Sequence, residues 1–382
     1  MVVAAAAPQL SLQCETIAGD TSTIRSLDWD RSRFDIEFGL RNGTTYNAFL
    51  VRGERTALID TSHAKFRDTW IPLLKEQIEP TAIDVLIVSH TEPDHSGLIG
   101  DLIDLNPDIE IVGSKVALQF LQDQVHRPFK SRAVKSGEEL DLGTNPESGI
   151  QHRFEFLSAP NLHWPDTIFS FDHGTGILYT CDAFGLHYCS DDVFDSDPGA
   201  IAPDFRFYYD CLMGPNARSV LQALKRMGGL PEINTIAVGH GPLLRHHLSH
   251  WVNDYREWSG QRSKGESYAA VCYLSQYGFS DRISQAIAHG IGKAEAQVQL
   301  VDLRATDPQE LTALIGDAKA VVVPTWPAEP DGELQASIGT LLAALHPKQL
   351  VGVFDAFGGN DEPIDAVADQ LRSQGQKQAF AP

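Results

Sequence analysis

The segment His90-Thr91-Glu92-Pro93-Asp94-His95 places four side chains that can bind a metal ion within six residues. It follows the apolar run at residues 85–88, which is typical of a buried strand. A strand that ends in such a cluster brings its ligands to one point at the rim of a sheet. The glutamate at the third position adds an oxygen donor where a zinc hydrolase of similar layout would have a second histidine. This difference favours iron over zinc and redox chemistry over hydrolysis.

Three later segments place further candidate ligands just after predicted strands, and glycine or proline punctuates each turn. Their positions are His163 after residues 154–158, Asp182 after residues 176–180, and His240 after residues 235–239. Strand ends that converge on one rim of a sheet would bring all these side chains into a single pocket.

The complete candidate set contains four imidazoles and three carboxylates, which are His90, Glu92, Asp94, His95, His163, Asp182 and His240. One ion cannot use so many protein ligands and keep an open position, whereas two ions can if Asp182 bridges them. Ions in two-metal sites lie roughly 3.5–4 Å apart, and nitrogen and oxygen donors without thiolates suit iron or manganese. A lone histidine such as His163 is more often a satisfied polar group, so the prediction depends on all four segments together.

The elements that would position these residues fall into two blocks. In the first block, strands in two groups are each closed by helices, which predicts a layered αββα sandwich. Within it, Asn42-Gly43 between two alternating runs predicts a β-hairpin. In the second block, strict alternation of strands and helices predicts a doubly wound parallel sheet. We therefore expect one domain over residues 1–262 and a second, α/β domain over residues 263–382.

The composition limits the classes of partner. The chain has 382 residues, of which 42% are hydrophobic, and a formal net charge of −21. Its length predicts two domains, and its negative charge makes nucleic acid and anionic membrane surfaces poor partners. No run reaches the roughly 20 apolar residues of a membrane span. The five cysteines form no CxxC pair and leave an odd count, which favours a reducing compartment such as the cytoplasm.

The motifs HxExDH, LHWPD, DAFG and GHGP occur in this order before a flavodoxin-like pattern, and together they resemble the flavodiiron protein family. That family joins a metallo-β-lactamase-like diiron domain to a flavodoxin-like domain that binds FMN. The resemblance covers nearly the whole chain, and no ligand position departs from the family pattern. It implies two irons bridged by Asp182, one bound by His90, Glu92 and His163 and the other by Asp94, His95 and His240.

The N-terminal part, including residues 42–47, most resembles the cyanobacterial oxygen-reducing branch of the family. Members of that branch carry an additional C-terminal flavin reductase domain, which we do not expect in this chain. The resemblance implies an oxidoreductase that reduces dioxygen to water, or nitric oxide, at a diiron centre supplied with electrons by FMN. It also implies an NAD(P)H-dependent flavin reductase domain or a ferredoxin-like donor as electron source. The expected assembly is a head-to-tail homodimer or a heterodimer with a paralogue.

The second domain has candidate flavin-binding loops at three strand ends. Residues 273–280 have the placement of a flavodoxin phosphate loop, in which amides and hydroxyls at a helix N-terminus hold the phosphate. The loops at residues 324–327 and 354–359 would contact the isoalloxazine ring. The predicted flavin-binding residues are Ser275, Tyr277, Gly278, Ser280, Pro324, Thr325, Trp326, Phe357 and Gly358.

These loops depart from the usual flavodoxin pattern. An Asn-Gly step common in the first ring-contacting loop is replaced by residues 327–330, and the second loop lacks its usual serine-tyrosine-glycine character. Glu329, Asp331, Asp361 and Glu362 also bring negative charge near an anionic cofactor. We therefore expect FMN to bind more weakly than in typical members. Residues 378–380 resemble the start of a last strand, so we expect a truncated chain with an exposed sheet edge.

Two other functions stay open on the sequence alone. A dinuclear metallohydrolase would use the same fold to activate water, although Glu92 and the flavodoxin-like domain favour redox chemistry. A regulatory partner of an active paralogue would keep the fold without its cofactors, which the altered flavin loops allow and the intact ligands oppose. Metal and flavin stoichiometry would separate these functions, since two zinc ions without flavin would favour hydrolysis.

Overall fold

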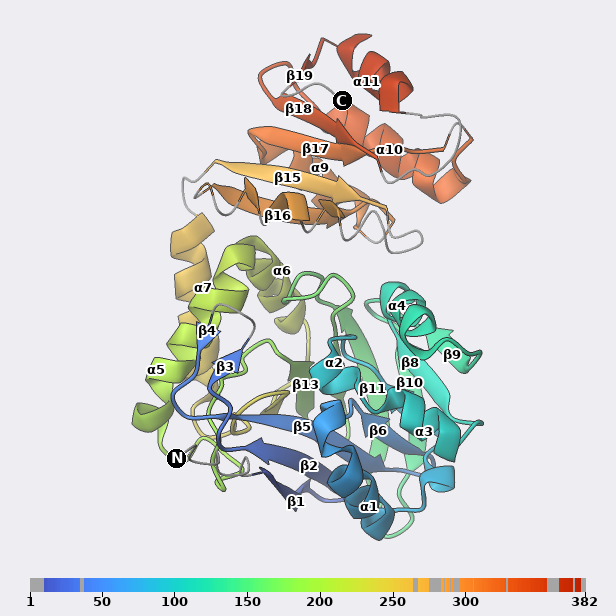
Figure 1. Cartoon of the computed structure of the whole chain (residues 1–382), viewed down its shortest axis with the longest axis vertical. Coiled ribbons are helices and arrows are strands. Elements are labelled where there is room, and N and C mark those ends of the chain that lie inside the picture. The colour runs from blue at the N-terminus through green and yellow to red at the C-terminus, as the bar shows by residue number, and fades with distance from the viewer. Residues whose placement is uncertain are drawn as a thin grey trace, which may run out of the picture. The chain divides into compact units, whose positions relative to one another are not determined.

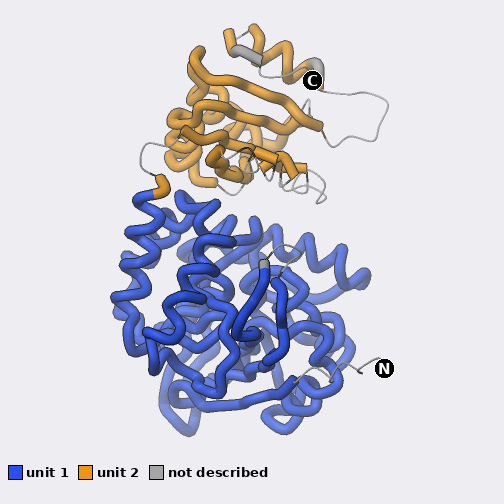
Figure 2. Tube along the Cα trace, turned by 60° about the vertical axis from the view of Figure 1, so that its left-hand side comes forward, with its two compact units in different colours: residues 1–261 blue, residues 262–382 orange. Residues whose placement is uncertain are grey.

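The computed structural model describes residues 10–34, 38–263, 267–274, 283–284, 286–288, 290–291, 294, 296–304, 306–327, 329–355, 364–373 and 375–378. The chain divides into two compact units, Met1–Gln261 and Arg262–Pro382 (Figure 2). This division lies one residue before the boundary expected from the sequence.

Unit 1 contains a seven-stranded sheet in the order β1-β2-β5-β6-β7-β8-β9 (Figure 1). The strands are β1 (Leu10–Ala18), β2 (Thr21–Asp28), β5 (Thr44–Arg52), β6 (Thr56–Ile59), β7 (Val85–Ile87), β8 (Glu110–Gly113) and β9 (Lys130–Ala133). Strands β1 to β6 of this sheet pair antiparallel, and β6 to β9 pair in parallel. The parallel strands all end at the same rim, which is where the first candidate ligands follow β7.

Helices cover one face of this sheet and bury an apolar stripe against it. They are η1 (Ala64–Phe66), α1 (Arg67–Gln77), η2 (Pro80–Ala82), α3 (Ile99–Leu105) and α4 (Lys115–Val125). Trp70 and Leu74 of α1 are fully buried in a core cluster that includes Leu58 and Leu86 of the sheet. Burial of each such side chain contributes roughly 1.5–3 kcal/mol relative to exposure. This packing holds β7 in place and therefore fixes the position of the turn that follows it.

The second sheet of unit 1 has the order β10-β11-β12-β13-β14. Its strands are β10 (Glu139–Thr144), β11 (Gln151–Ser158), β12 (Ile168–Asp172), β13 (Ile177–Cys181) and β14 (Thr235–Val238). The associated helices are α5 (Pro198–Tyr208), η3 (Tyr209–Met213), η4 (Gly214–Asn216), α6 (Ala217–Met227) and α7 (Leu248–Ser263). One apolar core joins both sheets and these helices, with Phe49, Phe154 and Phe205 among its fully buried members. The predicted αββα sandwich is confirmed.

The predicted hairpin at Asn42-Gly43 is wrong. These residues connect β4 (Phe38–Gly39) to β5, but β4 pairs with β3 (Arg33–Phe34), and β5 pairs with β2 and β6. Gly43 has a φ of +63°, and a Cβ there would lie 2.5 Å from the Asp28 carbonyl oxygen. Only glycine adopts this turn without strain. The dipeptide therefore marks a real turn, but long-range pairing decides which strands become neighbours.

Unit 2 is a parallel sheet in the order β16-β15-β17-β18-β19, which is the strand order of a flavodoxin-like doubly wound fold. Its strands are β15 (Tyr268–Tyr273), β16 (Gln297–Asp302), β17 (Ala320–Pro324), β18 (Leu350–Phe354) and β19 (Lys377–Gln378). Its helices include α9 (Pro308–Asp317), α10 (Gly332–Ala344) and α11 (Ile364–Ser373). The predicted parallel sheet is confirmed. Among the described helices, none is both long and apolar enough to cross a membrane.

Candidate metal centre

The first four candidate ligands lie on the turn after β7 and on the short helix α2 (Pro93–Ser96). Pro93 occupies the first turn of this helix, where its missing N–H is not needed, so the helix begins directly after Glu92. The carbonyl oxygen of His95 accepts hydrogen bonds from Thr61 N at 2.7 Å and from Thr61 Oγ1 at 2.6 Å. These bonds fix the end of the turn, and His90 and His95 are fully buried there.

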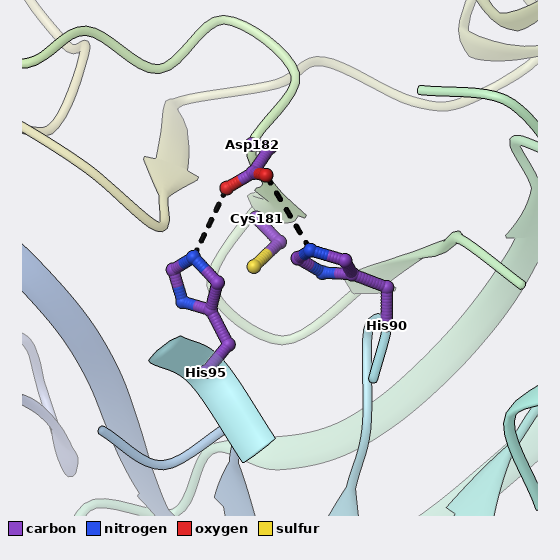
Figure 3. Close-up of side chains that lie close together, drawn as sticks. All are labelled: His90, His95, Cys181 and Asp182. Atoms are coloured by element: carbon purple, nitrogen blue, oxygen red, sulfur yellow. Dashed lines mark ion pairs between the residues drawn. The ribbon is translucent and has the colours of Figure 1, made fainter. Parts of the chain in front are cut away.

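Asp182 lies just after β13 and is fully buried, and its two carboxylate oxygens face different ligands (Figure 3). Oδ2 lies 3.0 Å from His163 Nε2 and 3.4 Å from His90 Nε2. Oδ1 lies 3.0 Å from His95 Nε2 and 3.4 Å from His240 Nε2. A carboxylate whose two oxygens serve two separate groups of donors has the geometry expected of a bridge between two ions.

The other two carboxylates complete these groups. Glu92 Oε2 lies 2.9 Å from His163 Nε2 and 3.4 Å from His90 Nε2. Asp94 Oδ2 lies 3.3 Å from His240 Nε2. The structure thus brings all seven predicted ligands together in one pocket. Glu92 belongs to the group of donors on one side of Asp182, and Asp94 belongs to the group on the other side. Their binding of metal stays a prediction.

The tautomer of His240 favours metal binding. Its Nδ1 lies 2.6 Å from the Thr45 carbonyl oxygen, which can only accept, so Nδ1 carries the proton. In the neutral ring, Nε2 then presents a lone pair to the pocket. This Nε2 lies 3.1 Å from Nε2 of His95. Two ring nitrogens at that distance cannot both carry hydrogens, and a cation beside them resolves the conflict.

Asp182 provides a second test of whether metal ions fit the pocket. Among the described residues, neither of its buried oxygens accepts a hydrogen bond of normal geometry. A buried carboxylate without hydrogen bonds must be balanced by positive charge, which here comes either from protonated imidazoles or from metal ions. Two divalent ions would satisfy both oxygens at once. The donor set is also rich in imidazole and carboxylate, which suits iron.

The ionisable side chains of the pocket strongly perturb one another. Burial opposes a charge on His163, but the carboxylates of Glu92 and Asp182 outweigh burial and raise its pKa to about 10. Burial alone would raise the pKa of Asp182, yet the neighbouring histidines, His90 and His95 foremost, hold it well below the usual range. The carboxylate therefore stays ionised. Metal ions would take the place of the imidazole protons.

Two further acids fix the ligand-bearing turn, and neither was among the predicted site residues. Asp166 Oδ2 accepts hydrogen bonds from Thr91 N at 2.8 Å and from Thr91 Oγ1 at 2.7 Å. Asp60 Oδ1 accepts a hydrogen bond from Ser89 N at 2.7 Å. Both carboxylates are buried and hold the residues on either side of His90. Asp166 ends the motif LHWPD, so its place in that motif was an available signal.

His187 is a buried neighbour of the pocket that was not among the predicted site residues, although it follows Asp182 closely in the sequence. Its Nδ1 lies 2.8 Å from Thr44 Oγ1, and its ring centroid lies 4.7 Å from that of His240 and 4.3 Å from that of Phe34. Burial, then the charge of His240, holds its pKa well below the usual value. A neutral imidazole and an aromatic ring therefore form one wall beside the candidate ligands.

The predicted flavin-binding residues are only partly described by the structure. Six of them lie outside the described residues, namely Ser275, Tyr277, Gly278, Ser280, Phe357 and Gly358. Pro324 ends β17, and Thr325 N donates a hydrogen bond to the Phe354 carbonyl oxygen at 3.0 Å. The loop after β17 therefore starts beside the end of β18.

Trp326 is buried and borders a cavity of about 450 Å³ with Pro327 and side chains of α10 and α11. Among the described residues, the lining contains two glutamines and no charged side chain. This cavity lacks the basic or convergent donor groups that a phosphate needs, so it does not replace the predicted phosphate loop.

A two-sheet sandwich with a convergent ligand set at its rim, followed by a flavodoxin-like sheet, defines a metallo-β-lactamase-like protein with a second, flavodoxin-like domain. Residues 44–241 match the family described as ODP family beta lactamase. The chain is similar over 98% of its length to the Flv1 flavodiiron core from Synechocystis sp. PCC6803, with 31% identity, a TM-score of 0.70 and 92% of that chain covered. The chain belongs to the flavodiiron protein family, as its motifs predicted.

Curated relatives from cyanobacteria are more similar in sequence. The putative diflavin flavoprotein A 3 of Nostoc sp. is 56% identical over 97% of this chain, and diflavin flavoprotein A 1 of Synechocystis sp. is 54% identical over 97%. The chain spans 64% of the length of each. The rubredoxin oxygen:oxidoreductase of Desulfovibrio gigas, at 24% identity and a TM-score of 0.61 over 97% of this chain and 92% of its own, shares the fold.

Proposed function

We propose that this chain is the core of an oxidoreductase that reduces dioxygen to water, with nitric oxide as the alternative substrate, at two irons. The observation that carries the proposal is the division of the Asp182 oxygens between two groups of ligands. The first group is His90, Glu92 and His163, and the second is Asp94, His95 and His240. Three protein ligands and a shared carboxylate on each ion leave open positions for a substrate.

When bound, two irons supply electrons and change oxidation state together, which suits reduction of a diatomic oxidant. The chain's own residues prepare the pocket for this chemistry. Asp182, Glu92 and Asp94 bring three negative charges that offset the charge of the ions. The Thr45 carbonyl oxygen holds His240 by its Nδ1–H, and Asp166 holds the turn between His90 and Glu92. Fixed ligands keep the geometry constant while the charge of the ions changes.

Buried rings control what surrounds the substrate. Tyr46 lies with its ring centroid 5.4 Å from that of His240, and Phe34 lies 6.5 Å from His163 and 6.3 Å from His240. Both aromatic side chains are buried. They exclude water from the ligand nitrogens and leave an apolar wall that favours a small neutral molecule such as dioxygen or nitric oxide.

The proposed electron supply is FMN bound by residues 262–382, reduced in turn by an NAD(P)H-dependent flavin reductase domain or by a ferredoxin-like donor. Curated relatives named diflavin flavoproteins extend beyond the part that this chain matches, which supports a separate flavin-reducing part. The exposed Glu329 beside the loop after β17 supports weak FMN binding, whereas the charge of Asp331 is offset by Arg304, whose Nη1 lies 2.8 Å from Asp331 Oδ2. Flavin that stays stoichiometric through long dialysis would contradict weak binding.

The activity is tested with purified chain loaded anaerobically with Fe(II), supplied with FMN and coupled to a separate NADH-dependent flavin reductase. Oxygen consumption and hydrogen peroxide are measured together, and nitric oxide consumption in a parallel experiment. We expect oxygen uptake without accumulation of peroxide, because the metal centre completes the reduction to water. Uptake equal to that of reductase and free FMN alone, with peroxide as product, would refute the proposed function.

A further inference from the structure

Cys181 lies among the candidate ligands, although the donor set expected from the sequence contains no thiolate. Its sulfur and the ligand atoms of His90, His95 and Asp182 all lie within 4.8 Å of one another. Figure 3 shows the sulfur between the rings of His90 and His95 and beneath the Asp182 carboxylate. All four side chains are buried. The sulfur therefore faces the same pocket as the candidate iron ligands.

The backbone explains how two consecutive residues reach one pocket. In a regular strand neighbouring side chains point to opposite faces, so Cys181 and Asp182 would diverge. The pairing of β13 with β14 shifts by one residue between Tyr179 and Cys181, and Cys181 has a φ of +50°. A bulge of this kind redirects side chains next to functional sites. It turns both Cys181 and Asp182 toward the same rim.

Gly239 leaves the space that the sulfur occupies. A Cβ at this position would lie 2.9 Å from Cys181 Sγ and 2.7 Å from His95 Cε1. The Gly239 N–H also donates a hydrogen bond to the Cys181 carbonyl oxygen at 2.7 Å. The glycine after β14 thus holds the bulge and lets the thiol approach the imidazole. Any larger residue would push one of the two out of the pocket.

We propose that Cys181 completes, with His90, His95 and Asp182, a mononuclear site for a thiophilic divalent ion such as zinc, and that this site overlaps the diiron site. One sulfur, two nitrogens and one oxygen form a donor set that zinc accepts in tetrahedral geometry. The ion replaces the thiol proton: the S–H bond breaks, the S–Zn bond forms, and the proton leaves to solvent without redox change. His90 and His95 belong to different iron groups, so one such ion excludes both irons.

The inference shares the pocket of the proposed function but does not depend on oxygen reduction. Cobalt(II) is the probe, because a thiolate bound to it gives an intense sulfur-to-metal charge-transfer band in the near ultraviolet. When cobalt(II) is added to the metal-free full chain, we expect this band to appear and to saturate at one ion per chain. Zinc added afterwards should remove the band. The Cys181→Ser variant should lack the band, whereas Cys189→Ser, which changes another buried thiol of unit 1, should keep it.

X-ray absorption of the zinc-loaded wild-type chain tests the same contact without any substitution. We expect one sulfur neighbour at about 2.3 Å from zinc. A wild-type chain with only nitrogen and oxygen neighbours around zinc, or a cobalt band that persists in Cys181→Ser, would overturn the inference.

Iron stoichiometry is measured in parallel. If the chain binds two irons but shows no sulfur contact, this inference fails and the proposed function stands; if sulfur binds zinc but iron never binds, the proposed function fails instead.

Discussion

At the scale of single residues, Asp182 is the point on which both ion positions depend. Every other candidate ligand lies in one group, whereas the Asp182 oxygens reach both. Asparagine has nearly the same shape, but it lacks the charge and replaces one acceptor oxygen with an NH₂ donor. We expect Asp182→Asn to reduce bound iron from about two ions per chain to fewer than about one.

Iron bound after anaerobic loading and dialysis is the measurement for this variant, with circular dichroism as the test of folding. Asp191→Asn is the matched control, because Asp191 is exposed and belongs to neither ligand group. The control should bind as much iron as the wild-type chain. A folded Asp182→Asn variant that keeps both irons would show that the carboxylate does not bridge.

The sequence predicted which candidate ligands would come together because each segment that carries them lies just beyond a strand end, and a strand end is a local feature; metal binding by these residues stays a prediction. Once the rims of the two sheets pack together, this alone brings His90, His163 and His240 into one pocket. Contacts between distant segments were not predictable in this way. The Thr45 carbonyl oxygen that orients His240 lies 195 residues away in the chain. Cys181 was missed because strand alternation places it opposite Asp182, and only the bulge reverses that expectation.

At the scale of elements, one buried acid organises the entry into α7. Asp195 Oδ1 accepts hydrogen bonds from the backbone N–H groups of Arg245 at 2.8 Å and His246 at 2.9 Å. Its Oδ2 accepts hydrogen bonds from His247 N at 3.2 Å and from Trp251 Nε1 at 2.9 Å. The carboxylate thus satisfies donors that precede the helix, and it lies where the helix dipole favours negative charge. Its distance of 50 residues or more from these partners explains why no local capping pattern revealed it.

We expect Asp195→Ala to lower the free energy of unfolding of unit 1 by roughly 2–3 kcal/mol, because it leaves the buried Trp251 ring N–H and three less buried backbone N–H groups without their acceptor. Urea unfolding followed by tryptophan fluorescence measures this change. Five of the six tryptophans, namely Trp29, Trp70, Trp164, Trp251 and Trp258, lie in unit 1. The exposed Asp192→Ala change should cost less than about 0.5 kcal/mol, and equal losses in both variants would contradict a specific role for Asp195.

The hairpin of β11 and β12 carries a pH-dependent contact that involves none of the predicted metal ligands. His152 is buried between two acids, with Nδ1 2.8 Å from Asp172 Oδ2 and Nε2 3.3 Å from Asp20 Oδ2. Burial alone would lower the pKa of His152, but the hydrogen bonds and charges of these acids outweigh burial and raise it. The two acids therefore stabilise the charged form of the His152 ring in the folded state more than water stabilises it in the unfolded state.

A folded-state pKa above the unfolded value gives stability that is complete at low pH and is lost as pH rises through the folded pKa. We expect the stability of unit 1 to fall over the pH range above the ordinary histidine pKa of about 6.5, by an amount that shrinks in His152→Gln. Urea midpoints across this range for both proteins provide the measurement, and the difference between them removes contributions from other groups. Identical pH profiles would exclude His152 as the source.

At the scale of the whole molecule, the metal ligands and the flavin loops belong to different units of one chain. On the sequence, the predicted ligands of unit 1 keep the family pattern at every position, whereas the predicted flavin loops of unit 2 depart from it. The proposed head-to-tail dimer sends electrons from the flavin of one chain to the irons of its partner, as the family resemblance implies.

Complementation between two inactive variants tests this arrangement. Asp182→Asn removes the metal bridge but keeps the flavin loops. Thr325→Glu adds a negative charge at the predicted flavin loop, beside the end of β18, but keeps the ligands.

If electrons cross between chains, a mixed dimer pairs the intact flavin of one variant with the intact irons of the other. We expect each variant alone to lack oxygen uptake and the two, unfolded and refolded together, to regain a substantial part of it. Electron transfer within each chain would instead leave the mixture inactive, and size-exclusion chromatography of the mixture establishes that dimers have formed.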